Sequence, residues 1–205
     1  MTVLRIGITG GLGSGKSILA KYFGERGAHV FDADREAKLI LLRSESVYRT
    51  VIASFGDHIL NKAGELDFRR LAEYAFAKPE RQQRLNDIIH PEVVQAADRQ
   101  MITASRQGVA LFVLDAALLF EAQLEQYLDV TIVVVADEEL RVKRALERGT
   151  LMEEDIRKRI RLQMPDSEKI ARADFVITND GTEDEFQKQF EALHNNLTSE
   201  SSSLP

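Results

Sequence analysis

A glycine-rich stretch near the start of the chain carries residue types that suit phosphate binding. Residues 10–17 read GGLGSGKS and match the pattern G-x-x-x-x-G-K-[ST]. Glycines let backbone N–H groups turn toward a phosphate because no Cβ atom blocks its approach, and a helix beginning near Lys16 would add its positive N-terminal end. The stretch predicts a phosphate loop, with Lys16 on the β- and γ-phosphates of a nucleotide and Ser17 on Mg²⁺. The backbone groups expected to hold the phosphates are those of Gly11, Leu12, Gly13, Ser14, Gly15, Lys16 and Ser17.

Acidic residues follow two apolar runs of the sequence. If these runs are strands of an open α/β sheet, the acids lie at the strand ends beyond which such sheets bind their ligands. Asp32 and Asp34 come after the run at 30–31, and Asp115 ends the run 109–115. If residues 32–34 are extended, the two carboxylates point to the same side. One could accept a proton from an attacking hydroxyl while the other orders metal-bound water, and Asp115 could hold Mg²⁺ or its waters. Each could instead cap the next helix, but we favour a functional role for Asp32 or Asp34.

Positive charge is concentrated in residues 141–172, which hold ten basic against six acidic residues. Arg141, Arg144 and Arg148 are spaced at i, i+3 and i+7 and share one face of a predicted helix. Such a face is most often a solvated surface, but beside a phosphate loop it can clamp a transferring phosphate. We favour this clamp for Arg144 and Arg148.

The elements that must position these residues alternate between strands and helices. Apolar runs at 3–9, 30–31, 109–115, 130–136 and 175–178 predict five strands. Strands that are apolar almost throughout indicate burial on both faces, as in a parallel sheet covered by helices. The sequence therefore predicts an α/β fold with a doubly wound parallel sheet of five strands around the phosphate loop (P-loop).

About seventy residues between the second and third strands contain no convincing strand. Helices are predicted at 36–42, 46–55, 67–77, 80–89 and 92–106. Asp67 stands at a helix start, and His90-Pro91 is expected to separate the last two helices. Because a minimal crossover is far shorter, we interpret this region as a helical insertion that could carry the site of a second substrate.

Composition excludes several kinds of protein. The chain has 205 residues, a formal net charge of −6 and no cysteine, so a disulfide scaffold, a thiolate zinc site and a cysteine nucleophile are ruled out. An acidic chain without a long basic arm gives no reason to expect nucleic acid as a partner. The longest apolar run, 130–136, is far shorter than the roughly 20 residues of a membrane span, and no leader-like stretch is visible. We expect a cytoplasmic protein without a membrane partner; the oligomeric state is not indicated.

As a set, the motifs resemble those of the dephospho-coenzyme A kinases. The matching segments, in the family's order, are residues 8–17, 30–34, 90–91, 118–121, 141–148 with Arg159 and Gln163, and 173–177 with Asn179. The resemblance implies transfer of the ATP γ-phosphate to the ribose 3′-hydroxyl of dephospho-coenzyme A, the last step of coenzyme A synthesis, with Mg²⁺ as cofactor. Two positions depart from the family's pattern: Ala117 stands where Pro is usual, and Arg141 where Gln is common.

The resemblance also implies roles for single residues. Asp34 becomes the expected base, Thr9 lies near the reacting phosphates and Arg144 is the arginine nearest to them. The expected catalytic residues are thus Thr9, Lys16, Asp34 and Arg144. Arg148 and Asn179 are further expected to bind the nucleotide. The residues expected to bind the second substrate are Asp34, His90, Leu118 and Arg144. The expected metal ligands are Ser17, Asp32 and Asp115.

The same resemblance, which covers about residues 4–195, implies a single kinase unit at residues 1–197. It implies a core of about 1–34, 108–140 and 173–197, a helical insertion for coenzyme A at 35–107, and a helical lid at 141–172. Residues 198–205 read as a disordered tail.

Two other functions stay open. The first is a P-loop kinase that acts on another nucleotide or small hydroxyl acceptor. The second is a nucleotide-dependent switch or binding module, which for guanine should carry N-K-x-D after a late strand. Residues 178–181 read TNDG and lack that lysine, which disfavours the switch.

Overall fold

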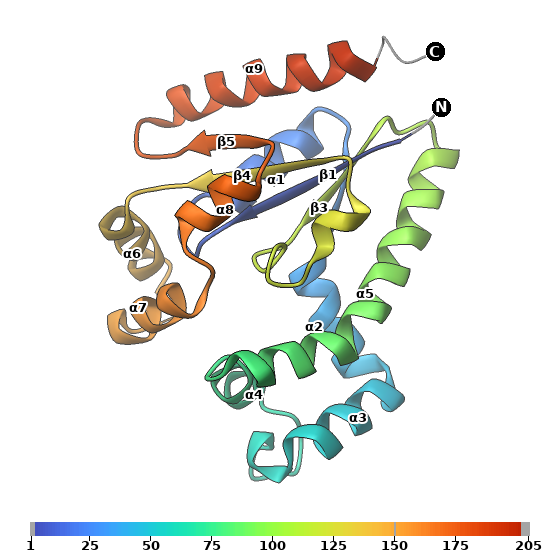
Figure 1. The fold of residues 1–205 in the computed structure, drawn as a ribbon, viewed down its shortest axis with the longest axis vertical. Coiled ribbons are helices and arrows are strands. Elements are labelled where there is room, and N and C mark those ends of the chain that lie inside the picture. Colours follow the sequence, from blue (N-terminus) through green and yellow to red (C-terminus); the bar gives the residue numbers. More distant parts are fainter. Residues whose placement is uncertain (1–2, 150, 202–205) are drawn as a thin grey trace. The chain divides into compact units, whose positions relative to one another are not determined.

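Five parallel strands form one sheet in the order β2-β3-β1-β4-β5 (Figure 1). The structure is a computed structural model that describes residues 3–149 and 151–201. The strands are β1 (Leu4–Gly10), β2 (His29–Asp32), β3 (Leu111–Asp115), β4 (Val130–Val135) and β5 (Phe175–Thr178). All five predicted strands are present, with ends within two residues of those expected. The predicted α/β class and five-stranded parallel sheet are therefore confirmed.

Apolar side chains bury the middle of this sheet on both faces. Ile6 and Ile8 of β1 are fully buried on one face, together with Ile132 and Val134 of β4, and Leu114 of β3 and Val133 of β4 are buried on the other. Helices α1 (Lys16–Glu25) and α9 (Glu183–Ser201) contribute aromatic residues to the same core. Figure 1 shows α9 alongside β5, where the Gln189 amide group bonds to the backbone of Thr178. The core thus holds β1 and α1, the two elements that flank the phosphate loop.

Helix α9 also corrects the expected tail. It extends through Ser201, so residues 198–201 are helical rather than disordered. The cause is that Phe190, Leu193 and Leu197 bury one face of the helix, and the Thr198 hydroxyl then donates to the carbonyl of His194 at 2.9 Å. The remaining tail residues, 202–205, lie outside the described residues.

Three short helices occupy the basic region. They are α6 (Glu138–Glu147), α7 (Glu153–Leu162) and α8 (Asp166–Arg172). Asp137 caps α6 by accepting hydrogen bonds from the backbone N–H groups of Glu139 and Leu140. Helices α6 and α7 pack through a small apolar cluster of Val142, Ala145, Ile156 and Ile160. The partly buried Leu12 of the phosphate loop packs against this cluster, so the basic region contacts the loop.

The described chain divides into two compact units. The first contains residues 3–32 and 100–201 without 150, and the second contains residues 33–99. The second unit is built from α2 (Ala33–Arg43), α3 (Glu45–Phe55), the short 3₁₀ helix η1 (Asp57–Ile59), α4 (Phe68–Ala75) and the larger part of α5 (Pro79–Arg106). Its only pairing of extended residues, within 33–99, is the single bridge between Leu60 and Leu66.

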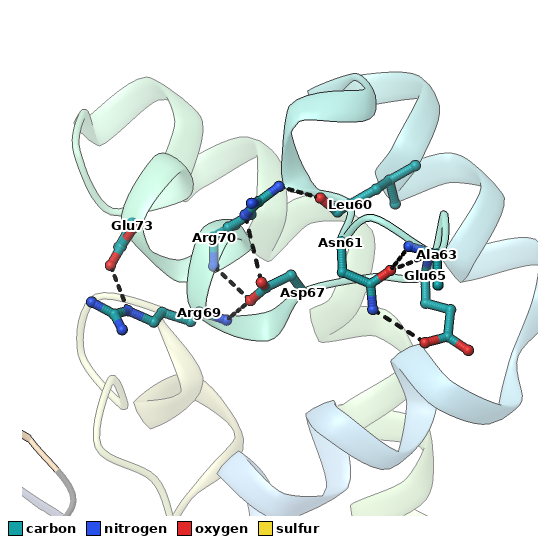
Figure 2. A network of polar contacts seen from close by, with 8 residues as sticks. All are labelled: Leu60, Asn61, Ala63, Glu65, Asp67, Arg69, Arg70 and Glu73. Carbon is teal, nitrogen blue, oxygen red and sulfur yellow. Dashed lines mark hydrogen bonds and ion pairs between the residues drawn. The ribbon is translucent and has the colours of Figure 1, made fainter.

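Helix starts in this unit depend on local side chains, as the connection between η1 and α4 shows (Figure 2). Asp67 accepts hydrogen bonds from the backbone N–H groups of Arg69 (2.9 Å) and Arg70 (3.1 Å), which confirms it as the start of a helix. Just before it, the Asn61 side chain accepts from the backbone N–H groups of Ala63 and Glu65 and closes a tight loop. The side chains of Asn61 and Asp67 therefore fix the backbone conformation between η1 and α4.

Two local expectations for this unit were wrong. Residues 32–34 are not extended: β2 ends at Asp32, and Asp34 lies in the first turn of α2, where the helix N-terminus favours an acidic residue. The two carboxylates therefore do not alternate as in a strand. His90-Pro91 does not separate two helices either, because α5 runs through Pro91. A proline removes one backbone N–H donor from a helix, yet α5 continues past Pro91 over a total of 28 residues.

None of the helices in the described part of the chain is long and apolar enough to cross a membrane.

Candidate phosphate site

The phosphate loop connects the end of β1 at Gly10 to the start of α1 at Lys16. Gly13 and Gly15 have φ angles of +82° and +103°, in the left-handed region that side chains disfavour. A Cβ atom on Gly13 would collide with the backbone of Arg141, and one on Gly15 with the side-chain amide of Asn179. Glycine is needed at both positions for conformation and for space, as the motif predicted.

Lys16 forms an ion pair with Asp115, the last residue of β3. The side chains of Lys16 and Asp115 are 13% and 9% exposed, so water screens this pair weakly. The contact arises because β1 and β3 are neighbours, with Ile8 opposite Asp115 in the register. The structure thus brings together the loop lysine and the acid predicted at the end of the third strand.

A divalent cation has suitable ligands at this edge of the sheet. Asp32 lies opposite Asp115 in the register of β2 and β3, and Ser17 is exposed in the first turn of α1. Carboxylate and hydroxyl oxygens suit Mg²⁺, which commonly takes one or two carboxylates together with substrate phosphates and water. The donor set of Ser17, Asp32 and Asp115 therefore fits this ion.

Thr9 lies just before the loop and is fully buried. Its hydroxyl donates a hydrogen bond to the carbonyl oxygen of Ala117 at 3.3 Å. Ala117 is one of the two departures from the family's pattern, and its contact is made by a backbone atom, which proline would also supply. Leu118 follows as a half-buried residue in the turn after β3.

Arg144 and Asn179 form a polar link to the loop. Arg144 Nη1 donates to the carbonyl oxygen of Asn179 at 2.8 Å, and Asn179 Nδ2 donates to the carbonyl oxygen of Ser14 at 2.7 Å. Asn179 directly follows β5 and is buried. Arg148, at the end of α6, is exposed. The structure therefore places Arg144 beside the loop through Asn179 and leaves Arg148 accessible to solvent.

Arg141 differs from the other two arginines because it points inward. It is buried, with 4% of the residue exposed, and its Nη1 donates to Asp166 Oδ2 at 2.6 Å. A Cβ atom on Gly11 would lie 2.6 Å from the same nitrogen, so the guanidinium group lies against the loop backbone. Contrary to what their spacing predicted, the three arginines therefore do not act together on one helix face, because Arg141 lies in the protein interior.

Three polar residues outside the expected set of site residues lie behind the loop; of these, only Glu121 had a candidate role from the sequence, as an acid placed like Asp115 but less decisive. Gln163 Oε1 accepts a hydrogen bond from the Leu12 backbone N–H at 3.0 Å, and Glu121 Oε1 accepts one from the Met164 N–H at 2.8 Å. Lys169 is fully buried, 3.6 Å from Glu121 Oε1. Burial lowers the pKa of Lys169, and the nearby Glu121 carboxylate opposes this effect. Gln163 and Glu121 lie in segments that matched the family. By contrast, nothing in the charge-rich sequence around Lys169 indicates that this lysine is buried.

Two expected site residues belong to the second unit. Asp34 is half-buried in the first turn of α2. His90 is half-buried within α5, and desolvation lowers its pKa while Asp87 opposes the shift.

The fold and the loop together define a P-loop protein of the α/β class. Shikimate kinase from Bacteroides thetaiotaomicron has the same fold, with a TM-score of 0.52 over 96% of this chain and 99% of that one, at 12% sequence identity. The particular family is shown by sequence. The family profile described as Dephospho-CoA kinase matches residues 4–185.

Individual relatives agree with the profile. Dephospho-CoA kinase from Geobacillus kaustophilus is 40% identical over 190 residues, covering 93% of this chain and 94% of the relative. A crystal structure of a Thermus thermophilus protein is 34% identical and covers 96% and 99% of the two chains, with a TM-score of 0.78. The chain belongs to the dephospho-CoA kinase family, and the resemblance read from its motifs is confirmed.

Proposed function

We propose that this chain performs the reaction of its family with the phosphate site described above. It is a kinase that transfers a phosphoryl group from ATP to dephospho-coenzyme A, the last step of coenzyme A biosynthesis. The observation that carries this conclusion is the family match over residues 4–185, which includes the intact phosphate loop. We further propose the 3′-hydroxyl of the ribose as the acceptor.

The proposed role of the loop is to hold the ATP phosphates with Lys16 and with backbone N–H groups drawn from residues 11–17. The Leu12 N–H, which was expected among them from the sequence, donates to Gln163 in this structure. To reach the phosphates, Lys16 must exchange Asp115 for a phosphate oxygen. Ser17, Asp32 and Asp115 would hold Mg²⁺, which when bound neutralises charge on the β- and γ-phosphate oxygens. The oxygen donors at the ends of β2 and β3 support this assignment.

Two further groups complete the proposed nucleotide site. Arg144 and Arg148 bind the negatively charged oxygens of the transferring phosphate, and Thr9 lies near this phosphate. Asn179 contacts the adenine region. The position of Arg144 and Asn179 beside Ser14 supports these roles.

Acceptor chemistry is assigned to the second unit. We propose that Asp34 accepts the proton of the ribose hydroxyl, and that His90 of the same unit and Leu118 of the first bind dephospho-coenzyme A. Region 35–107 would carry this substrate, and region 141–172 would act as a lid. The family match supports each assignment, and we place the reaction in the cytoplasm with no nucleic-acid partner.

The test is ADP release from Mg-ATP with dephospho-coenzyme A as the acceptor, beside AMP and adenosine. We expect turnover only with dephospho-coenzyme A. Lys16→Ala should abolish it, whereas Lys21→Ala, an exposed change on the same helix, should not. Turnover with AMP or adenosine instead would indicate a kinase of another acceptor. Tight ATP binding without stimulation by any acceptor would favour a binding module.

A further inference from the structure

The short α7–α8 linker (residues 163–165) contacts the phosphate loop directly. Its first residue, Gln163, directly follows α7, and its side-chain carbonyl accepts the Leu12 N–H at 3.0 Å. Leu12 lies inside the loop, between Gly11 and Gly13. Its N–H therefore points at the linker in this structure. A hydrogen bond at this position sets the orientation of a peptide unit within the loop itself.

The next residue of the linker is held from a different element. The Met164 N–H donates to Glu121 Oε1 at 2.8 Å, and Glu121 lies in the turn after β3. Lys169 Nζ lies 3.6 Å from the same oxygen, with the Lys169 side chain 0% and the Glu121 side chain 10% exposed. Removing one partner of such a buried ion pair strongly destabilises the folded protein, because the other charge then remains buried without compensation. The pair therefore fixes the position of Met164, and with it the neighbouring Gln163.

A third contact ties the start of α8 to α6. Asp166 accepts a hydrogen bond from Arg141 at 2.6 Å, and the Arg141 guanidinium lies against Gly11. The chain is thus attached to the loop on both sides of α7, through Arg141 before it and through Gln163 after it. A displacement of α7 would have to break or strain one of these contacts.

We propose that Gln163 is a positioning residue of the phosphate loop: by accepting the Leu12 N–H it fixes this peptide unit, so that other backbone N–H groups of the loop can face the phosphates, and the Glu121–Lys169 pair holds Gln163 in place. The side chain supplies a carbonyl acceptor without negative charge, which suits a position beside a nucleotide's phosphates. The proposal rests on the proposed function for the identity of the ligand, since the loop must bind ATP.

The direct test is amide hydrogen exchange at Leu12 in the full chain without nucleotide. Gln163→Leu removes the acceptor and should accelerate Leu12 exchange about 10-fold or more, with a similar rise in the Kd for ATP measured by calorimetry. The Leu4 amide, bonded to Ala110 at the far end of β1, should exchange as in the wild type. Gln187→Leu is the matched control, because Gln187 is an exposed residue of α9.

Gln163→Glu separates positioning from charge. It keeps an acceptor of the same length, so Leu12 protection should be retained while the added carboxylate weakens ATP binding. In both variants the KM for dephospho-coenzyme A should stay within about twofold, since the change affects the nucleotide side of the reaction. Unchanged Leu12 exchange or an unchanged ATP Kd in Gln163→Leu would overturn the proposal. Failure of dephospho-coenzyme A turnover in the wild type would instead overturn the proposed function, because neither Leu12 exchange nor the ATP Kd requires turnover.

The supporting pair is tested by a double variant. Lys169→Met leaves the Glu121 carboxylate buried without its partner, and Leu12 exchange should accelerate as in Gln163→Leu. Adding Glu121→Gln removes the unpaired charge and keeps an acceptor for Met164, so Leu12 exchange should return toward the wild-type rate. If Lys169→Met does not fold, Lys169→Met with Glu121→Ala, which removes both the charge and the acceptor for Met164, takes its place and should accelerate Leu12 exchange in the same way. A folded Lys169→Met variant, alone or with Glu121→Ala, in which Leu12 exchange and the ATP Kd stay as in the wild type would contradict the role of the pair.

Discussion

Lys16 and Asp115 illustrate how single residues depend on partners far along the chain. The two form an ion pair across 99 residues, at the junction of the phosphate loop and β3. In the proposed reaction both charges have other partners: Lys16 binds phosphate oxygens and Asp115 binds the metal. The pair keeps the two side chains at the site without nucleotide and must separate when nucleotide binds.

The base assignment predicts a selective loss of turnover. Asp34→Asn removes the proton acceptor and should lower kcat by about 100-fold or more, while the ATP KM changes little because Asp34 is assigned to the acceptor. Steady-state kinetics with both substrates measures this split. Asp98→Asn, at an exposed position of α5, should retain full activity. A kcat unchanged in Asp34→Asn would show that another group accepts the proton.

The loop glycines allow a matched test of space against conformation. Gly15→Ala combines a positive φ with a collision against Asn179, so it should lower the free energy of unfolding by more than about 1 kcal/mol and impair ATP binding. Gly27 also has a positive φ, +86°, but a Cβ atom there would meet nothing within 4 Å. Gly27→Ala should thus lower the free energy of unfolding only by the cost of placing alanine at a positive φ, and it should leave ATP binding intact. Equal effects of the two variants in urea unfolding and calorimetry would refute the collision with Asn179.

At the scale of elements, local capping and long-range packing decide different features. The start of α4 follows from Asp67, whose side chain satisfies two backbone N–H groups within three residues. The end of α9 follows instead from packing of Leu193 and Leu197 on the sheet core, which carries the helix into a serine-rich segment. Capping was predictable from the sequence, whereas the extension of α9 required knowledge of what the helix covers.

Removal of the α4 cap should weaken that helix. Asp67→Ala leaves two backbone donors without their acceptor and should lower the free energy of unfolding by about 1 kcal/mol. Asp67→Asn should preserve most of the stability, because an asparagine side chain caps nearly as well. Hydrogen exchange across residues 68–75, together with urea unfolding, measures the effect. Equal destabilisation by the alanine and asparagine variants would indicate that the charge of Asp67, not its capping oxygen, stabilises α4.

At the scale of the whole molecule, the sheet order creates the site. Parallel strands in the order β2-β3-β1-β4-β5 end at one edge, where Asp32, Asp115 and Asn179 reach the same border as the loop. β1 lies at the centre, with β3 and β4 on its two sides, and ligands of open α/β sheets bind at such a change of direction. Polar residues from segments far apart in sequence thereby lie along one edge of the sheet.

Stability should fall in mildly acidic solution because of two partly buried histidines. Burial lowers the pKa of His90, and burial together with Arg26 lowers that of His194, while Asp87 and Glu191 oppose the respective shifts. Below the ordinary histidine pKa of about 6.5, the unfolded chain therefore binds protons more readily than the folded one.

The free energy of unfolding should consequently be highest above pH 7 and decrease as pH falls from 7 to 5. Urea unfolding of the wild type, His90→Gln and His194→Gln at pH 7.5 and 5.5 measures this, and each variant should flatten the pH dependence. The carboxylates with lowered pKa, such as Asp129, contribute mainly below pH 5 and would not mimic the effect. A wild-type stability that rises toward pH 5.5 would contradict the burial of these rings.

Local patterns in the sequence determined a large part of the fold and of the site. Five apolar runs predicted the strands, because a strand buried on both faces must be apolar almost throughout. The phosphate loop was predictable because its function requires particular residues in a fixed order, and its two positive-φ glycines are as the motif implies. The same reasoning failed at residues 32–34 and at Pro91, since the choice between strand, turn and helix there depends on neighbouring elements.

Only the tertiary structure decided which side chains meet. The contact of Gln163 with Leu12 spans 151 residues, and the burial of Lys169 and Arg141 depends on how α6 and α8 pack behind the loop. A sequence pattern reports the chemistry of a residue and its local conformation. It does not report the residue's partner, because that partner is set by strand order and helix packing across the whole unit. The loop's chemistry was therefore readable from eight consecutive residues, whereas its supports became visible only in the folded chain.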